Sequence, residues 1–274
     1  MNLKEKKFVE TVWAHYRKEG RHDLPWRNTK NAYRILVSEI MLQQTQVERV
    51  IPKYKSFLKK FPSLASLASA PLGDVLREWQ GLGYNRRAKM LHECAKIIVK
   101  DHRGVLPKTH SALMKLPGVG HYTAGAVLAF AHNEAVPIIE TNIRTVSIHH
   151  FFHDEIDIPD KEILRLTVVF LGGIKQKKNP REWYYALMDY GAYLKKTKGN
   201  QNLKSKHYTK QSAFKGSDRQ IRGAIIRVLS EGENTRKDFY RKLSSDIQRI
   251  DEQLERLKEE GMVVFERRKY SLPK

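Results

Sequence analysis

Two short stretches of the chain carry residue types that could do chemistry together. The first is Leu116–Gly120, in which glycines form a tight turn directly before the apolar helical run Tyr122–Phe130. A glycine turn at a helix start presents backbone amides to an anion. The second is Val136–Asn142, where Glu140 follows a short apolar, strand-like run at an expected helix start. The two stretches predict an anion grip with a carboxylate near it.

The composition indicates what the anion is. The 274 residues include 51 Lys and Arg against 30 Asp and Glu, which gives a formal net charge of +21 and a pI near 9.9. Such an excess favours a polyanionic partner, and nucleic-acid phosphate fits best. An anionic membrane surface is a weaker alternative, because no strongly amphipathic basic helix stands out. A phosphate grip with a carboxylate nearby suits a DNA-repair active site.

Cysteine content and apolar runs limit the class of protein further. Cys94 is the single cysteine of the sequence, so an intrachain disulfide and a cysteine-ligated metal cluster are both excluded. Residues 1–8 hold no signal-peptide core, and no apolar run reaches the ~18 residues of a membrane span. We expect a cytoplasmic, nucleoid-associated monomer with no membrane partner.

Helical spacing dominates the first two hundred or so residues. One apolar face is predicted for a first helix, formed by Phe8, Val9, Val12, Trp13 and Tyr16. A second helix is predicted from Tyr33 to about Val50, with prolines punctuating short helices after it at Pro52, Pro62 and Pro71.

Further turns and helices are predicted along the same part of the chain. The glycine turn Gly81–Tyr84 precedes a helix from Arg86 to about Lys100. After Glu140 we expect a helix, an acidic loop over Asp154–Asp160, and two more helices that end near Lys195.

The segment after these helices is polar and basic. Residues 195–215 hold seven lysines and no acidic residue, which predicts an exposed linker that is part solvated tether and part phosphate-facing strap. From Ser217 a new pattern predicts two helices, the second over Asp238–Leu243. A third follows a capping box of Ser245 and Gln248 and ends at Gly261.

The chain ends in a predicted β-hairpin with Glu266–Arg268 at its tip, so the last part is expected to be a winged helix. Five acidic residues on its third helix make that helix a poor reader of DNA. The Arg267 and Arg268 wing is the better candidate for a DNA contact, and a bracing or protein-facing role is equally open. The predicted domains are 1–194, the lysine-rich linker 195–216, and the winged helix 217–274.

Several motifs in register resemble one enzyme family. They are Leu24–Arg27, Val37–Val47 (Val-Ser-Glu-Ile-Met-Leu-Gln-Gln-Thr-Gln-Val), Gly81–Tyr84, Leu116–Gly125 and Leu187–Ala192. Together, over roughly residues 8 to 195, they resemble the helix-hairpin-helix (HhH-GPD) DNA glycosylases, and within them the MutY-type adenine glycosylases. The resemblance implies an all-α fold of two helical lobes, here followed by the C-terminal winged helix.

The resemblance also implies the roles of the catalytic residues. Cleavage of an N-glycosidic bond needs an acid for the leaving base and an anion for the oxocarbenium-like sugar, and the base must first leave the stack. By resemblance Glu39 is the acid that protonates adenine and then activates water. Partial burial on an apolar helix would raise its pKa for that task. Tyr122 replaces the Schiff-base lysine of the strand-cutting members and braces Glu39, and Asn142 orients water and carboxylates.

The resemblance assigns DNA-binding roles as well. Gln44 and Tyr84 match residues that wedge into the base stack. Thr45 and Leu82, assisted by Gln43, match positions near the partner base, which is 8-oxoguanine in this family. The amides of Gly118 and Gly120 are expected to hold a phosphate. Assisting positions are Lys115 and His121, and Arg27 is also placed among the DNA-binding residues.

The chain departs from the family in three ways. Glu140 stands where the family has aspartate. One methylene moves the carboxylate by ~1.5 Å, and a misplacement of ~1 Å can cost about a hundredfold in rate. Glutamate is also a poor N-cap, so Thr141 is a candidate for that role. We still expect an active enzyme, because Glu39, Tyr122 and Asn142 remain.

The other departures concern a cofactor and a domain. The family's four iron–sulfur cysteines correspond to Lys195, Asn202, Ser205 and Gln211, so we expect no cluster and no other cofactor. By the resemblance, we expect the winged helix to stand where the family usually has a domain that checks for 8-oxoguanine.

Three functions stay open. The leading one is a monofunctional glycosylase for adenine opposite 8-oxoguanine or guanine in duplex DNA. The alternatives are a glycosylase for another base, such as uracil, thymine or hypoxanthine, and an inactive lesion-binding protein.

Overall fold

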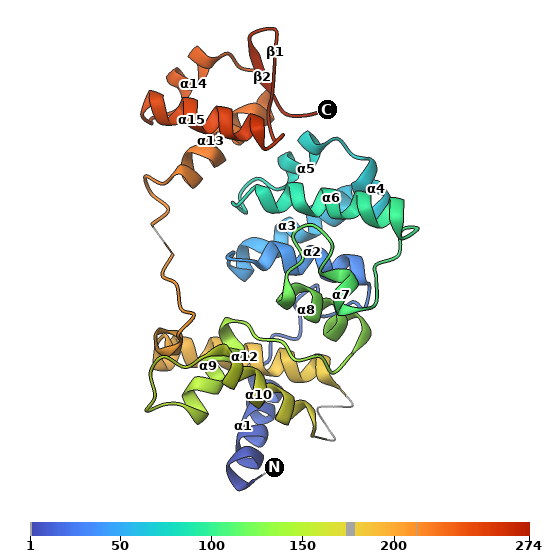
Figure 1. The fold of residues 1–274 in the computed structure, drawn as a ribbon, viewed down its shortest axis with the longest axis vertical. Helices are drawn as coiled ribbons and strands as arrows, with labels where there is room; N and C mark the ends of the chain where they lie inside the picture. Colours follow the sequence, from blue (N-terminus) through green and yellow to red (C-terminus); the bar gives the residue numbers. More distant parts are fainter. Residues whose placement is uncertain (1, 174–178, 212) are drawn as a thin grey trace. The chain divides into compact units, whose positions relative to one another are not determined.

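The protein is mostly helical and divides into two compact units (Figure 1). The computed structural model describes residues 2–173, 179–211 and 213–274. Unit 1 comprises residues 1–36, 108–114 and 119–210, and unit 2 comprises residues 37–107, 115–118 and 211–274. The prediction of an all-α, two-lobed fold is confirmed. No helix in the described ranges is both long enough and apolar enough to cross a bilayer.

The helices of unit 1 follow the apolar spacing of the sequence closely. They are α1 (Leu3–Glu19), α7 (His110–Leu113), α8 (His121–His132), α9 (Thr141–Phe151), α10 (Asp160–Leu171), α12 (Pro180–Lys198) and the 3₁₀ turn η1 (Gln201–Lys204). The predicted apolar face of α1 is buried as expected. Phe8 lies 4.8 Å from Phe170 and 6.1 Å from Trp183, ring centre to ring centre, so α1, α10 and α12 share one aromatic core.

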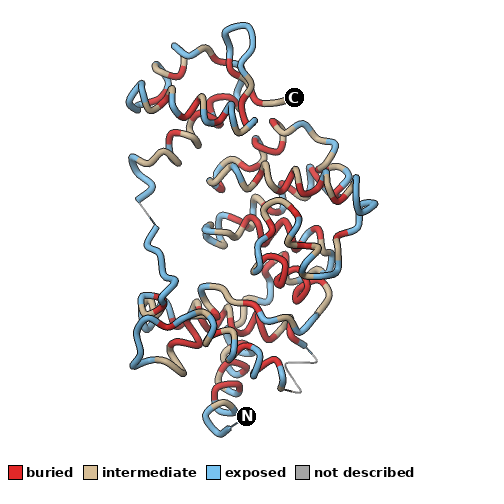
Figure 2. Tube along the Cα trace, viewed as in Figure 1, coloured by how far each residue is buried: buried red, intermediate tan, exposed pale blue. Residues whose placement is uncertain are grey.

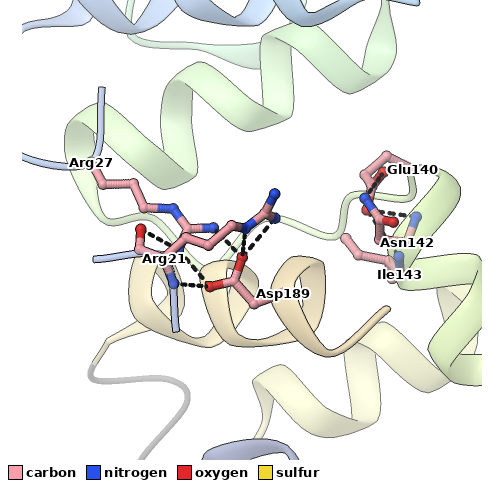
Figure 3. A network of polar contacts seen from close by, with 6 residues as sticks. All are labelled: Arg21, Arg27, Glu140, Asn142, Ile143 and Asp189. Carbon is pink, nitrogen blue, oxygen red and sulfur yellow. Dashed lines mark hydrogen bonds and ion pairs between the residues drawn. The ribbon is translucent and has the colours of Figure 1, made fainter. Parts of the chain in front are cut away.

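A buried ion pair ties the N-terminal segment of unit 1 to α12. Asp189 is 4% exposed and accepts two hydrogen bonds from the Arg27 guanidinium, at 2.7 and 2.8 Å. The backbone and side chain of Arg21 donate to the same carboxylate at 2.9 and 2.7 Å (Figure 3). Burial alone would raise the pKa of Asp189, but the hydrogen bond and charge of Arg27 and the charge of Arg21 outweigh it, and the pKa is lowered.

Unit 2 joins the middle of the chain to its C-terminal end. Its elements are α2 (Ala32–Leu42), α3 (Val47–Lys60), α4 (Leu64–Ser69), α5 (Leu72–Glu78), α6 (Arg86–Asp101), α13 (Asp218–Glu231), α14 (Arg236–Lys242), α15 (Ile247–Glu259), β1 (Val264–Glu266) and β2 (Lys269–Ser271). The first residues of α2 are grouped with unit 1. The Gly73 amide donates to the Pro273 carbonyl at 2.8 Å, so the end of the chain is bound to the start of α5.

The single helix predicted from Tyr33 to Val50 is wrong, because the chain turns between α2 and α3. Arg87 explains the turn. One nitrogen of its guanidinium donates to the carbonyls of Ile40 and Met41 at 2.8 and 2.9 Å and also to that of Gln43. The other donates to the Leu82 carbonyl at 3.1 Å. Burial lowers the pKa of Arg87 to about 10, so it stays charged at neutral pH. Pro52, predicted to end a helix, instead lies inside α3.

Residues 217–274, here called the C-terminal module, show the predicted order of three helices and a hairpin. β1 and β2 pair antiparallel with Phe265 opposite Tyr270, and Asn234 adds a further bridge to Tyr270. The assignment as a winged helix and the predicted domain boundaries stay predictions. The predicted capping box of Ser245 and Gln248 is wrong: Asp246 caps α15 by accepting from the Arg249 amide at 3.0 Å.

The lysine-rich linker is partly structured. α12 extends to Lys198, and η1 is fixed by a parallel bridge between Ile158 and Ser205. The described residues from Lys206 to Gly216 are exposed, as the pale blue tube in Figure 2 shows, while Ser212 lies outside the described residues.

Replacing Asp189 with asparagine would leave the buried Arg27 guanidinium without its counter-charge. We expect Asp189→Asn to lower the free energy of unfolding by about 3–5 kcal/mol, the range for breaking a buried ion pair. Urea unfolding followed by circular dichroism measures the change. Glu162→Gln is the matched control, because the pair that Glu162 forms with Arg165 is exposed, and such pairs contribute about 1 kcal/mol or less. Equal losses in both variants would contradict the assignment.

Candidate active site

Glu140 lies at the N-terminus of α9 and serves as its N-cap. Its Oε1 atom accepts from the backbone amides of Asn142 and Ile143 at 2.8 and 2.9 Å. Its Oε2 atom accepts from the Asn142 side-chain amide at 3.2 Å (Figure 3). The expectation that Thr141 would cap this helix is wrong. Although glutamate is a poor N-cap in general, here the longer side chain folds back onto its own helix and reaches both amides.

The surroundings of Glu140 favour the neutral form of its carboxyl group over the charged form. Removal from water raises the pKa of the carboxyl group, while the hydrogen bonds from the two amides and the charges of Arg144 and Arg21 lower it. Removal from water prevails, so the pKa lies above its usual value of 4.5. The carboxylate is therefore fixed in place at both oxygens and has a raised affinity for a proton.

Two glycines let neighbouring helices approach the Glu140 segment closely. A Cβ atom on Gly191 of α12 would lie 2.4 Å from the Asn142 carbonyl oxygen. A Cβ atom on Gly125 of α8 would lie 2.3 Å from a methyl carbon of Ile138. Real Cβ atoms do not come that close, so glycine is required at both positions. Gly191 therefore lets α12 pack against the Asn142 backbone, and Gly125 lets α8 pack against the Ile138 side chain.

Two polar side chains fix the backbone on either side of Glu140. The buried Tyr184 hydroxyl donates to the Val136 carbonyl at 2.6 Å and accepts from the Ile138 amide at 3.2 Å. Asn202 of η1 is 2% exposed and donates to the Thr141 carbonyl at 3.2 Å and to the Thr145 hydroxyl at 2.8 Å. The segment that carries Glu140 and Asn142 is thus held by α12 and by η1.

The predicted acid Glu39 lies on α2 and is 6% exposed, between the buried Ser38 and Ile40. This side chain is therefore largely withdrawn from solvent.

The predicted wedge residues occupy two turns of unit 2. Gln44 and Tyr84 both have left-handed backbone conformations, with φ of 56° and 49°. The Thr45 hydroxyl donates to the Leu82 carbonyl at 3.3 Å, and Arg87 also donates to Thr45 at 3.0 Å. Left-handed conformations of non-glycine residues are costly and concentrate at functional sites. Gln44 is exposed, whereas the Leu82 side chain is 5% exposed.

The predicted phosphate grip is formed by the glycine turn before α8. Gly118 has φ of +76°, and Gly120 is the N-cap of α8 with open space where a side chain would be. Lys115 and His121 are exposed beside the turn, and Tyr122, the second residue of α8, is half-buried. The turn therefore places an exposed glycine and an exposed lysine at a helix N-terminus, where an anion is favoured.

Arg27 is the predicted DNA-binding residue that the structure places elsewhere. Its side chain is 5% exposed, lies 4.5 Å from the Tyr185 ring centre and is paired with Asp189. This geometry commits it to unit 1 rather than to a phosphate. Sequence reasoning missed its partner Asp189, although an acid within the apolar stretch 186–194 of α12 signals a buried counter-charge. It also missed the role of Arg87. The spacing of charged residues along α6 gives no indication that this one is partly buried.

The positions aligned with the family's cluster ligands do not fit an iron–sulfur site. Lys195, Asn202, Ser205 and Gln211 offer no thiolate, and the single cysteine, Cys94, is buried in α6 with its pKa raised by burial to about 12. Within the described residues, no three His, Cys, Asp or Glu side chains gather to hold a metal ion. Asn202 instead binds the start of α9 by hydrogen bonds.

Comparison with known proteins identifies the family. A family model described as "HhH-GPD superfamily base excision DNA repair protein" matches residues 37–170. An adenine DNA glycosylase of Mycobacterium tuberculosis (strain ATCC 25618 / H37Rv) is 36% identical over 237 residues, which cover 80% of this chain and 77% of the relative. The chain belongs to the HhH-GPD superfamily. The predicted resemblance to its adenine DNA glycosylases is confirmed by these matches.

Other superfamily members agree. An adenine DNA glycosylase of Buchnera aphidicola subsp. Baizongia pistaciae is 39% identical over 187 residues and covers 68% of this chain, which spans about half (52%) of that relative's length. A solved thermostable thymine-DNA glycosylase has a TM-score of 0.60 and 29% identity, covering 69% of this chain and 86% of its own. An endonuclease III–DNA complex shares the fold alone, with a TM-score of 0.55 at 18% identity over 71% of this chain and 86% of its own.

Glu140→Gln removes the charge but keeps an oxygen that can accept from Asn142 and Ile143. A carboxyl group whose pKa is raised on folding binds more protons in the folded state between the two pKa values, so wild-type stability falls as pH rises through that window. We expect the variant to have the higher Tm at neutral pH, and the difference to disappear as pH falls below 4.5, the ordinary pKa. Thermal melts against pH measure this. Glu155→Gln, at an exposed position, is the control. The argument would be contradicted if the Tm difference between Glu140→Gln and wild type became less favourable to the variant as pH rises from acid to neutral.

Asn202→Ala removes the hydrogen bonds that join η1 to the start of α9. We expect the free energy of unfolding to fall by about 1–3 kcal/mol, because the buried Thr145 hydroxyl loses its donor Asn202 and keeps only its bond to the Thr141 carbonyl among those described. Leu203→Ala, at a neighbouring position that is 67% exposed, is expected to change little. Denaturant titration of both variants compares them, and a loss no larger than that of Leu203→Ala would rule out this fixing role.

Proposed function

We propose that the protein is a monofunctional DNA glycosylase of base excision repair that removes adenine mispaired with 8-oxoguanine or guanine. The observation that carries the proposal is the fixed Glu140–Asn142 pair at the start of α9, in a chain 36–39% identical to relatives named adenine DNA glycosylase. Because the chain spans about half of the Buchnera relative, activity, substrate and partners are proposed here for this chain.

The chemistry divides between two carboxyl groups. Glu39 donates a proton to the adenine ring as the glycosidic bond breaks and its electron pair leaves with the base. The Glu140 carboxylate stabilises the positive charge that develops on the sugar, and Asn142 holds that carboxylate through its side-chain amide. Water then adds to the sugar carbon and gives its proton to the Glu39 carboxylate, which restores the acid.

Tyr122 determines what the enzyme leaves behind. A phenol cannot form the Schiff base by which a lysine amine opens the sugar and cuts the strand. The proposed product is therefore an abasic site in an intact backbone.

The proposed partner is duplex DNA with a mispair or lesion, bound by a single protein molecule beside the chromosome. The net charge of +21 supports binding to phosphate. The exposed Gly120 at the N-terminus of α8 supports a phosphate contact there. We propose that the enzyme works without an iron–sulfur cluster, since the aligned positions carry no thiolate.

Incubation with duplexes that carry single mispairs, followed by alkali, tests the activity. We expect strand breaks only after alkali, and only at adenine opposite 8-oxoguanine or guanine. Glu39→Gln is expected to reduce the single-turnover rate by at least a hundredfold, the range of general acid catalysis. Glu140→Asp is expected to preserve or raise the rate, because aspartate is a good N-cap.

The other outcomes distinguish the alternatives. Strand breaks at thymine or uracil would show that one of these bases, and not adenine, is the substrate. The 29% identity to the thymine-DNA glycosylase is the reason to include them. Binding without any abasic product would indicate a lesion-binding protein. A large rate loss in Glu140→Asp would show that the pocket is built for the longer side chain.

A further inference from the structure

A cavity in unit 2 lies between the C-terminal module and the two turns that carry the predicted wedge residues. It measures about 1000 Å³ and is lined by residues of the 44–49 and 80–87 segments, by α13, and by Gln211 and Phe214 of the linker. This volume is at the upper end of what a small ligand fills. It therefore exceeds the space that one phosphate needs and suits a stretch of nucleic-acid backbone.

The lining of the cavity is strongly cationic. Six arginines contribute to it, namely Arg49, Arg86, Arg87, Arg219, Arg222 and Arg227. Glu260 is the single carboxylate among the lining residues, and it pairs with Arg222 at 2.7 Å. The remaining positive charge has no counter-charge in the lining. Guanidinium groups bind phosphate oxygens through paired hydrogen bonds.

The C-terminal module also touches the predicted wedge residues directly. The Arg219 guanidinium of α13 donates to the Tyr84 hydroxyl, and its carbon lies 5.3 Å from the centre of that ring. Arg87 lies 5.4 Å from the same ring centre, so Tyr84 contacts two guanidinium groups. On the linker, Gln211 donates to the Gln44 side chain at 2.8 Å. The module and linker therefore belong to the same surface as Gln44 and Tyr84.

Three of the arginines are available for a ligand. The side chains of Arg49, Arg86 and Arg227 are in exposed residues and form no hydrogen bond or ion pair with any residue that the structure describes. Phe214, at the edge of the cavity, is 60% exposed. Exposed aromatic rings among arginines are typical of surfaces that bind nucleic acids.

Gly223 leaves part of the cavity wall bare. It lies within α13, lines the cavity, and has no atom within 4 Å of the place where a Cβ atom would lie. Glycine inside a helix costs about 0.5–1 kcal/mol relative to alanine. A larger residue could therefore be accommodated here without a clash, and glycine keeps the cavity open beside Arg219, Arg222 and Arg227.

We infer that this arginine-lined cavity binds the sugar-phosphate backbone of DNA, so that α13 makes the C-terminal module part of the DNA-binding surface. The inference deepens the proposed function and rests on it for the identity of the ligand. It assigns the module's DNA contact to α13 rather than to the Arg267 and Arg268 wing favoured by the sequence. DNA engages Arg49, Arg86 and Arg227 next to Tyr84 and Gln44.

A matched pair of substitutions at Gly223 tests the inference. Glutamate and glutamine have nearly the same shape, so Gly223→Glu and Gly223→Gln differ by one negative charge in the cavity. Fluorescence anisotropy with the full chain and an undamaged labelled duplex measures affinity over a range of salt. We expect Gly223→Glu to bind at least tenfold more weakly than Gly223→Gln at low salt. Thermal melts of both variants show whether they are folded.

Neutralising the available arginines gives a second readout. The plot of log affinity against log salt has a negative slope, and each lost phosphate contact makes it shallower by about 0.9. We therefore expect Arg227→Gln and Arg49→Gln each to make the slope shallower by up to that amount. Equal binding by the two Gly223 variants would overturn the inference. A loss of affinity seen only in the Arg267→Gln/Arg268→Gln variant would also overturn it. The same holds if free deoxyadenosine monophosphate competes with the duplex at the concentration that saturates a small-molecule site.

The glycosylase assay separates this inference from the proposed function. If the wild type releases no base but the Gly223 pair differs in duplex binding, the proposed function fails and the inference stands. If the wild type releases adenine and the Gly223 variants bind equally, the inference fails alone.

Discussion

The hydrogen bonds between the Glu140 carboxylate and the first amides of α9 are the constraint on which the rest of unit 1 depends. Both oxygens are occupied, by the amides of Asn142 and Ile143 and by the Asn142 side chain. A carboxylate that caps its own helix has its position set by the helix axis rather than by a flexible side chain. The α9 N-terminus must therefore be immobile, and the surrounding contacts serve that end.

Two kinds of contact hold the segment that carries Glu140: close packing at two glycines, and hydrogen bonds from polar side chains. Gly191 allows α12 to touch the backbone after Glu140, and Gly125 allows α8 to touch the Ile138 side chain before it. Tyr184 bonds to backbone groups before Glu140, and Asn202 bonds to the Thr141 carbonyl after it. The buried carboxylate of Asp189 fixes α12 to the N-terminal segment, and its partner Arg21 also lowers the pKa of Glu140.

The sequence predicts those features that depend on local spacing. The buried face of α1, the glycine turn before α8 and the C-terminal hairpin follow from apolar periodicity and turn residues. It does not predict features that depend on distant partners. Asp189 and Arg27 are 162 positions apart, and Arg87 ends α2 from 44 positions away by binding the Gln43 carbonyl. Propensity alone continues that helix, because its residues contain no breaker. Catalytic roles came from the motifs, and the capping role of Glu140 came from the fold.

Arg87 has a consequence for the energetics of the proposed base extrusion. Its one guanidinium joins the backbone of the turn after α2 to that of the turn before α6, so the two turns are held to each other. Under the proposed function this edge enters the stack of bases, and an edge that is already ordered loses little conformational entropy on doing so. More of the binding free energy is then left to offset the cost of unstacking a nucleotide, and less is spent on freezing loops.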